Sequence, residues 1–327
     1  MEGRDVAFYC VADADYFVGL VALLNSVRLN GHGEQFYVLD SGLLPRQRQQ
    51  LEPHVTLVQN HSGQHPILSK SYAPLHFPAD TMLLLDSDMI ATRPLVPLIE
   101  AAAEGRVVVF ADAIDRFVPK WESLLGLPPL RRMAYVNSGC FAFSREVGVP
   151  LLERVRDVQQ RVQISGSRLG KGTPSDPFYF PDQDAWNAVL ASTVEPERLW
   201  VLENRLAPFP PFGGLELDRS LPAGCRYPDG EVPYFVHCIS RKPWLASTPR
   251  SVYTELLKRL LFGDDVPVRL RPEDVPRRLR TGLVARVAGV VAEGSAWVAG
   301  KRGKLGIRPR VATAVNGVRK TRYSDAR

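Results

Sequence analysis

Residues Met82–Asp88 read MLLLDSD, an apolar run that ends in two aspartates. A short, continuous apolar run favours a buried strand, and ligands of open α/β folds bind where such strands end. Asp86 and Asp88 stand two positions apart, so on an extended chain both side chains point to the same side. The stretch therefore predicts a strand that delivers two carboxylates to the ligand-binding edge of a sheet.

Strands and helices alternate on both sides of this stretch. Apolar runs predict further strands at 5–12, 35–40, 55–58, 106–110, 134–143 (interrupted at 137–139) and 232–238. Helical spacing predicts helices at 16–29, 45–51, 94–103, 146–162, 182–191 and 249–261. This alternation predicts an α/β fold with a mostly parallel central sheet and flanking helices.

Length and composition limit the class of protein. The chain has 327 residues, of which 45% are hydrophobic, so disorder and collagen are excluded and one large or two smaller domains fit. Its apolar runs are shorter than a membrane span requires, and the N-terminus reads as a first strand rather than a secretion signal. Four scattered cysteines without a CxxC pair indicate a reducing compartment. We expect a cytoplasmic protein.

Net positive charge is concentrated in the C-terminal part of the chain. Residues 265–327 contain 15 Lys and Arg against 5 Asp and Glu, whereas the rest of the chain is slightly acidic. The sequence therefore predicts a body at 1–262 and a basic, partly amphipathic tail at 263–327. Such a tail suits an anionic membrane surface, and a solvated terminus is the alternative. Its aromatic residues are too few for a nucleic-acid groove, so no nucleic-acid partner is expected.

Two carboxylates on one side of a strand end repel each other unless a cation lies between them. A hard divalent ion with oxygen ligands fits, and it would also neutralise a diphosphate. A polar turn is the structural alternative. A haloacid-dehalogenase-like phosphatase also carries Asp-x-Asp after an apolar strand, but that motif opens its domain and is followed by Thr or Val where this chain has Ile90.

A histidine and a lysine follow the predicted late strand, in the sequence VPYFVHCISRKPW at 232–244. A neutral imidazole suits Mn²⁺, so His237 is a candidate third ligand. Lys242 carries a compact ammonium group suited to a phosphate oxygen. A lone histidine is more often structural than ligating, so both interpretations stay open.

Two further segments carry side chains that suit sugar recognition. In YVNSG at 135–139, the amide of Asn137 can hydrogen-bond to sugar hydroxyls and Gly139 permits close approach of the backbone, with a strand bulge as the alternative. In PDQDAWN at 181–187, Asp182 and Gln183 open a helix, and capping alone would explain them.

Taken in order, four motifs resemble glycosyltransferase family 8. They are Asp86-Ser87-Asp88, Asn137-Ser138-Gly139, Asp182-Gln183-Asp184, and His237 followed by Lys242-Pro243-Trp244. The segments VADADY at 11–16 and FYVLDSGL at 36–43 are similar to the nucleotide-binding start of that family. The resemblance covers about residues 5–262, and the family includes bacterial lipopolysaccharide galactosyl- and glucosyltransferases and glycogenin-like enzymes.

The resemblance implies a GT-A fold and a retaining hexosyltransferase that uses Mn²⁺ or Mg²⁺. The donor would be a nucleotide sugar, UDP-glucose or UDP-galactose, and the acceptor a saccharide or glycolipid. With its basic tail, a cytoplasmic protein of this kind would bind peripherally to the inner face of the membrane. The implied metal ligands are Asp86, Asp88 and His237; the implied donor-binding residues are Asp13, Tyr16, Asp86, Asn137, Lys242 and Asp115; the implied catalytic residues are Asp182 and Gln183.

The chain departs from the family pattern at two points. The family has Tyr-Ala-Arg-Leu before the Asp-x-Asp strand, and this chain has Pro74 in place of the arginine, so either Lys70 supplies the cation or the donor differs. The segment between His237 and Lys242 is also shorter than in the family. A catalytically impaired nucleotide-sugar-binding protein is therefore the alternative function.

Overall fold

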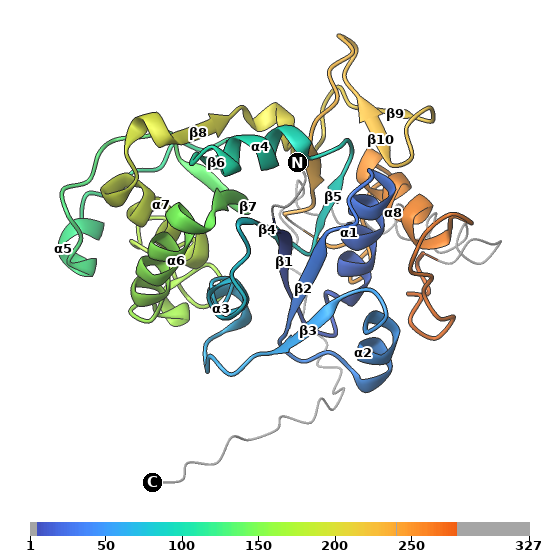
Figure 1. Ribbon diagram of the computed structural model, residues 1–327, viewed down its shortest axis with the longest axis horizontal. Coiled ribbons are helices and arrows are strands. Elements are labelled where there is room, and N and C mark those ends of the chain that lie inside the picture. Colours follow the sequence, from blue (N-terminus) through green and yellow to red (C-terminus); the bar gives the residue numbers. More distant parts are fainter. Residues whose placement is uncertain (1–4, 240, 280–327) are drawn as a thin grey trace, which may run out of the picture. The chain divides into compact units, whose positions relative to one another are not determined.

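The computed structural model describes residues 5–239 and 241–279. A seven-stranded sheet forms its centre, in the order β3-β2-β1-β4-β7-β6-β8 (Figure 1). In chain order these strands are β1 Val6–Ala12, β2 Gln35–Asp40, β3 Thr56–Gln59, β4 Thr81–Asp86, β6 Val107–Ala111, β7 Val136–Ser144 and β8 Leu199–Leu202. All the strands predicted before residue 145 are present, and the short β8 carried no signal strong enough to predict it.

Most neighbours in this sheet run parallel. β1 pairs in parallel with β2 and β4, β2 with β3, and β6 with β8. Only β7 among the strands of this sheet runs against its two neighbours, β4 and β6. The predicted α/β fold with a mostly parallel sheet is therefore confirmed.

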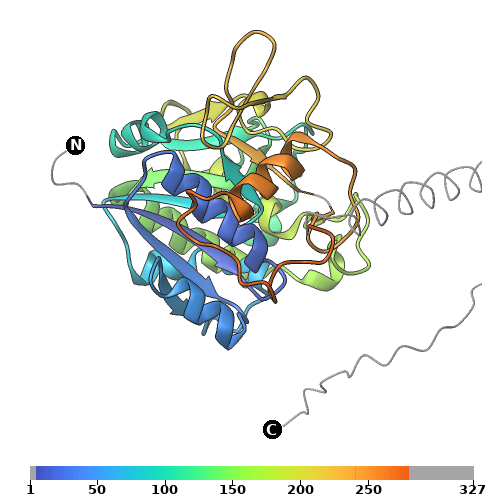
Figure 2. The ribbon, with the colours of Figure 1, turned by 90° about the vertical axis from the view of Figure 1, so that its right-hand side faces the viewer.

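Helices cover both faces of the sheet. They are α1 Phe17–Leu29, α2 Pro45–Leu51, α3 Tyr72–His76, α4 Val96–Ala103, α5 Trp121–Leu125, α6 Arg145–Gln159, α7 Pro181–Thr193 and α8 Val252–Phe262. One apolar core joins the sheet to α1, α4 and α8, and a second joins its other face to α3, α6 and α7. Figure 2 shows α8 beside α1, although the two helices come from opposite ends of the described chain.

The predicted interruption of the strand at 137–139 takes the form of an irregular register. β7 is continuous along β4, where Leu85 pairs with Cys140. Along β6 the pairing shifts between Val109 and Phe110, which oppose Phe141 and Asn137. The residues between these two partners leave the ladder with β6, although Cys140 stays paired with β4, so the interruption is a bulge on one side of β7.

A second, two-stranded sheet lies beside the central one. β5, Met89–Ala91, follows the Asp-x-Asp turn and pairs antiparallel with β11, Phe235–His237. The late strand predicted at 232–238 is thus confirmed in a shorter form. A third pair joins β9, Glu216–Asp218, to β10, Gly224–Arg226. Strands of three residues, such as β5, carry too little periodicity to be predicted from sequence.

The chain continues to pack against the body beyond α8. Val266 and Val268 are buried, and the Asn25 side chain donates hydrogen bonds to the carbonyls of Leu260 and Val268, both at 2.8 Å. Residues up to 280 form one compact unit, so we propose that the body ends there and not at 262. Most of the predicted basic tail, including its amphipathic stretch, lies outside the described residues.

Within the described residues, no helix combines the length and the apolar character that crossing a membrane requires.

Candidate functional site

A pocket of about 750 Å³ opens at the ends of the central strands. Its floor includes Asp86 at the end of β4, with Val11 of β1 on one side in the ladder and β7 on the other. The turn after β1 adds Asp13, and the start of α7 adds Asp182. The volume lies in the range of small-molecule sites, so this pocket suits a ligand of nucleotide-sugar size.

Asp86, Asp88 and His237 converge in this pocket. The antiparallel pairing of β5 with β11 places His237 opposite Met89, and the Cys238 amide donates to the Asp88 carbonyl at 3.0 Å. His237 Nε2 lies 3.0 Å from Asp88 Oδ1 and 3.7 Å from Asp86 Oδ2. The backbone pairing thus brings together side chains that lie far apart in sequence.

Two lysines hold the other oxygens of this aspartate pair. Lys70 Nζ lies 2.6 Å from Asp86 Oδ1, and Lys242 Nζ donates to Asp88 Oδ2. Burial alone would raise the pKa of Asp88, but Lys242 and His237 outweigh this effect and hold that pKa below its ordinary value. Asp88 is therefore ionised, and each of the two carboxylates has one oxygen bound to a lysine and the other facing His237.

The three groups fit a divalent cation. One ligand atom from each of Asp86, Asp88 and His237 lies within 4.8 Å of the others, and two carboxylate oxygens with an imidazole nitrogen suit Mn²⁺. The imidazole packs closely against Gly139, since a Cβ at that position would lie 2.4 Å from His237 Cε1. The close approach expected at Gly139 thus involves the histidine.

A network of amides and a carboxylate forms the neighbouring part of the pocket. The Asn137 amide donates to Asp112 Oδ2 at 3.0 Å and to Gln183 Oε1 at 3.3 Å. Gln183 Nε2 donates to the same Asp112 oxygen at 3.1 Å. Asn137, Gln183 and Asp112 all line the pocket, and such groups can hydrogen-bond to sugar hydroxyls.

Asp182 lies between the aspartate pair and this network. It is buried in the first turn of α7, where the helix dipole favours an acidic side chain. Gln159 Nε2 donates to its Oδ1 at 2.9 Å, and Lys70 Nζ to its Oδ2 at 2.7 Å. Capping does not explain this residue, because its side chain caps no described backbone amide of α7.

Asp13 and Tyr16 form the far end of the pocket. Asp13 Oδ1 accepts hydrogen bonds from the amides of Asp15 and Tyr16, both at 3.0 Å, which fixes the turn between β1 and α1. The Tyr16 ring meets the Trp244 ring edge-on, with 6.4 Å between centroids, and Trp244 Nε1 donates to the Asp15 carbonyl. Lys242 Nζ lies 5.7 Å from the centroid of the Tyr16 ring, so this end adjoins the Asp88 carboxylate that Lys242 binds.

Asp115, a predicted donor-binding residue, lies on an exposed loop. It does not line the pocket; its side chain is 70% exposed and pairs with Arg132 at 2.7 Å. Asp112 lines the pocket instead, because it follows β6 directly, whereas Asp115 lies three residues further along the loop. The same rule that singled out Asp86, an acidic residue directly after an apolar strand, would have identified Asp112.

The third residue of the Asp182-Gln183-Asp184 motif has a structural role. Asp184 is fully buried and accepts hydrogen bonds from Tyr135 Oη and Arg116 Nε, both at 2.7 Å. Arg116 also donates to the carbonyls of Pro174 and Asp176. Asp184 thus anchors the loop before α7, which contributes Arg168, Leu169 and Phe180 to the pocket.

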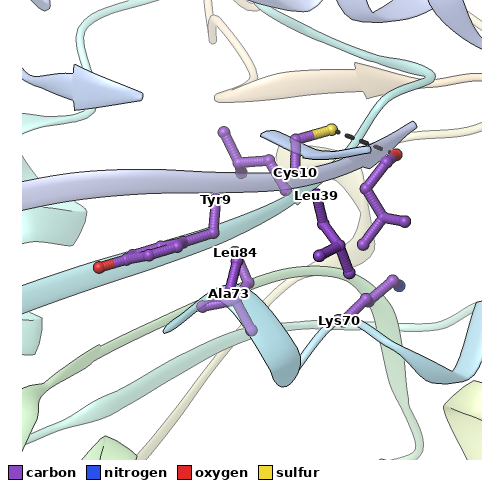
Figure 3. Close-up of a pocket in the computed structure, with 8 residues that line it drawn as sticks. Tyr9, Cys10, Leu39, Lys70, Ala73 and Leu84 are labelled. Atoms are coloured by element: carbon purple, nitrogen blue, oxygen red, sulfur yellow. Dashed lines mark hydrogen bonds between the residues drawn. The ribbon is translucent and has the colours of Figure 1, made fainter. Parts of the chain in front are cut away.

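A second cavity lies behind the pocket, between Tyr9, Leu39, Ala73 and Leu84 (Figure 3). It measures about 10 Å³, which is room for one water molecule at most. Figure 3 shows Lys70 at its edge, with the ammonium group pointing away from the Tyr9 hydroxyl. The cavity is too small for a substrate, so the large pocket is the candidate active site.

Solved structures show which fold this is. The chain aligns with the galactosyltransferase LgtC in complex with donor and acceptor sugar analogs at a TM-score of 0.51 and 16% identity, over 79% of this chain and 98% of that one. It also aligns with the glycosyltransferase GlyE of Streptococcus pneumoniae TIGR4 at a TM-score of 0.52 and 15% identity, over 80% and 61%. The alignment with the bifunctional glycosyltransferase WbbM has a TM-score of 0.51 and 15% identity. It covers 81% of this chain and 50% of WbbM.

These alignments confirm the GT-A fold that the sequence motifs implied. They leave the phosphatase alternative without structural support. Identities this low establish the fold and not the reaction. No protein-family model matches the chain.

Sequence comparison with curated proteins gives only partial matches. N-acetyl-gamma-glutamyl-phosphate reductases of Xanthomonas euvesicatoria pv. vesicatoria (strain 85-10) and Xanthomonas axonopodis pv. citri (strain 306) are each 34% identical, over 105 and 90 residues. The chain spans 32% and 28% of their lengths, and the matches cover 30% and 25% of this chain. Matches of this extent do not assign the chain to that family.

Proposed function

We propose that the chain is a divalent-metal-dependent glycosyltransferase that moves a hexose from a nucleotide sugar to a saccharide or glycolipid acceptor. The proposal is supported chiefly by the convergence of Asp86, Asp88 and His237 beside Lys242 in a pocket of about 750 Å³. The GT-A fold adds support, since the structures that share it are glycosyltransferases. UDP-glucose and UDP-galactose are the expected donors, from the resemblance to glycosyltransferase family 8.

The charged residues would act on the leaving group. Departure of the sugar leaves a nucleoside diphosphate, whose terminal phosphate gains negative charge as the glycosidic bond breaks. Bound to Asp86, Asp88 and His237, Mn²⁺ or Mg²⁺ would neutralise part of that charge. Lys242 would contact the phosphate from the adjacent side, and its electrostatic effect would grow as the charge develops. At the far end, Asp13 and Tyr16 would bind the nucleoside.

The amide residues would hold the sugar. Asn137 and Gln183 present hydrogen-bonding groups beside Asp112, and Asp182 adds a carboxylate close by. The anomeric centre becomes positively charged in the transition state, so a nearby carboxylate or amide oxygen would stabilise it. We assign this role to Asp182 and Gln183, and we expect transfer with retention of configuration, as in the family that the motifs resemble.

The experiment is a panel of nucleotide sugars incubated with the purified chain and Mn²⁺, scored by release of nucleoside diphosphate. We expect release from at least one UDP-hexose and its loss in excess chelator. The Asp88→Asn variant should be inactive while its circular dichroism spectrum is unchanged. Full activity of Asp88→Asn in chelator would contradict the metal assignment.

The same panel tests the non-catalytic alternative, which the loss of the family arginine at Pro74 favours. A binding protein would take up a UDP-sugar, measurable by calorimetry, without releasing UDP under any acceptor condition. The ionised Asp88 beside Lys242 argues for catalysis, because a site without turnover has no need to retain all three proposed metal ligands together with a lysine placed to contact phosphate.

Attachment to an anionic membrane surface is a separate part of the proposal and rests on the charge of residues 265–327. Sedimentation with vesicles that contain anionic lipid, at low and high salt, tests it. We expect binding that weakens as salt rises, because screening shortens the range of the attraction. A version of the chain that ends at residue 279 should stay in solution.

A further inference from the structure

Lys70 lines the pocket and contacts three oxygens of the protein there. It lies in the short segment between the turn Pro66–Leu68 and α3. Its Nζ donates to Asp86 Oδ1 at 2.6 Å, to Asp182 Oδ2 at 2.7 Å and to the carbonyl of Ser138 at 2.8 Å. One ammonium group therefore joins the end of β4, the first turn of α7 and the bulge in β7.

These three contacts use the whole hydrogen-bonding capacity of the lysine. An ammonium group has three N–H donors and no acceptor, and each donor of Lys70 meets an oxygen of the protein. The ammonium group therefore has no N–H left for a nucleotide sugar.

The partners of Lys70 are also fixed on their other sides. The second oxygen of Asp182 accepts from Gln159, and the second oxygen of Asp86 faces His237. Both carboxylates thus have one oxygen whose position depends on Lys70. Asp86 belongs to the proposed metal site and Asp182 to the proposed reaction centre. Because Lys70 binds both carboxylates, it sets the position of the metal site relative to the reaction centre.

We propose that Lys70 is a positioning residue, which acts through Asp182 and does not contact the donor. This inference rests on the proposed function. It also answers the question raised by Pro74: Lys70 does not replace the family arginine as a donor-facing cation. The donor would then face a different set of cations from the one in the family. Among the described residues that line the pocket, Lys242 is the buried cation in that set.

A double-mutant cycle on donor hydrolysis tests this inference. The variants are Lys70→Met, Asp182→Asn and the two combined, assayed at saturating Mn²⁺ so that Asp86 keeps a cation beside it. We expect Lys70→Met to lower kcat by about 10- to 100-fold, the usual effect of losing a residue that orients an active-site group, with the donor KM changed less than about 3-fold. In the Asp182→Asn background the same substitution should change kcat by less than about 3-fold, since residues that act as a unit are not additive.

Direct contact with the donor would give the opposite pattern. The two kcat effects would then multiply, and Lys70→Met would raise the donor KM in both backgrounds. Thermal unfolding supplies a readout that does not depend on activity. Lys70→Met strands a buried carboxylate, so its Tm should fall, and the double variant should recover part of the loss because the asparagine that replaces Asp182 is neutral.

Lys120→Met is the matched control, because Lys120 is exposed and lies outside the pocket. It should leave kcat, KM and Tm unchanged. If the wild-type chain hydrolyses no nucleotide sugar, the proposed function is wrong, and the inference about Lys70 loses the reaction on which it rests. The Tm values of the single and double variants would still test whether Lys70 and Asp182 are coupled. If wild-type is active and the cycle is additive, only the inference about Lys70 is overturned.

Discussion

The two halves of the pocket are built on different principles. In one half, Asp86, Asp88 and His237 are ionic or ionisable groups held by two lysines, and the charges nearly balance before any ligand enters. In the other half, Asn137 and Gln183 converge through neutral amides on Asp112. Charged groups stabilise charge that develops during a reaction, whereas amides select among hydroxyl groups. The comparison is the basis of our proposal that the first half would bind the diphosphate and the second the sugar.

The largest effect is expected from His237→Ala in the charged half. The substitution removes one of the three converging groups and leaves Asp88 without its imidazole partner. We expect kcat for donor hydrolysis to fall by about 10³-fold, as for the loss of a main electrostatic contact in the transition state. The measurement is UDP release at saturating Mn²⁺, with His54→Ala, at a partly exposed position outside the pocket, as the control. A kcat within about 10-fold of the wild-type value would show that His237 has no main electrostatic role in the reaction, since the expected loss is about 10³-fold.

Gly139→Ala tests the contact between the two halves. The added Cβ would lie 2.4 Å from His237 Cε1 and 2.9 Å from Asn137 Oδ1, so the imidazole or the bulge must shift. We expect about a 10- to 100-fold weaker binding of Mn²⁺, the scale on which residues that orient metal ligands act. Electron paramagnetic resonance of free Mn²⁺ measures it. Unchanged affinity would show that the position of the imidazole does not depend on this contact.

Asp112→Asn tests the amide half. It replaces a carboxylate that accepts from Asn137 and Gln183 by a neutral amide, and hydrogen bonds to charged groups contribute about 1.5–3 kcal/mol. We expect the donor kcat/KM to fall by about 10-fold or more while the Mn²⁺ affinity stays unchanged. A parallel loss of Mn²⁺ affinity would show that the two halves are not separate. Asp115→Asn, which alters an exposed residue outside the pocket, should have no effect on either quantity.

Gly19→Ala gives an effect on stability rather than on chemistry. A Cβ at this position of α1 would lie 2.4 Å from the Ser87 carbonyl and 2.7 Å from the Trp244 ring. Overpacking of this kind destabilises by about 1–3 kcal/mol. Urea unfolding followed by fluorescence measures it. If Gly19→Ala left the free energy of unfolding unchanged, α1 could move away from the Asp-x-Asp turn without loss of stability.

The two halves also differ in how far the sequence predicts them. Asp86 and Asp88 were identified because a continuous apolar strand precedes them, and His237 because it follows another. Asn137 was identified through the break that it makes in β7. These are local signals, and they are sufficient for six of the seven strands of the central sheet, for most helices and for most of the candidate site residues.

Other features depend on contacts between distant segments. Lys70 lies in no strand or motif, and its position is set by β4, β7 and α7 together. Asp112 carried a local signal, the end of β6, but the family pattern directed attention to Asp115. The strand β5 has three residues and forms only because β11 pairs with it. Pairing partners of this kind cannot be read from a single stretch of sequence.

The central claim is that Asp86, Asp88 and His237 bind one divalent cation together with a nucleoside diphosphate. Titration of the chain with Mn²⁺ in the presence of UDP, followed by electron paramagnetic resonance of the free ion, tests it most directly. The predicted result is one Mn²⁺ bound per chain, with binding strengthened by UDP and lost in both Asp88→Asn and His237→Ala. Binding of equal strength in wild-type and His237→Ala, or no effect of UDP on either, would contradict it.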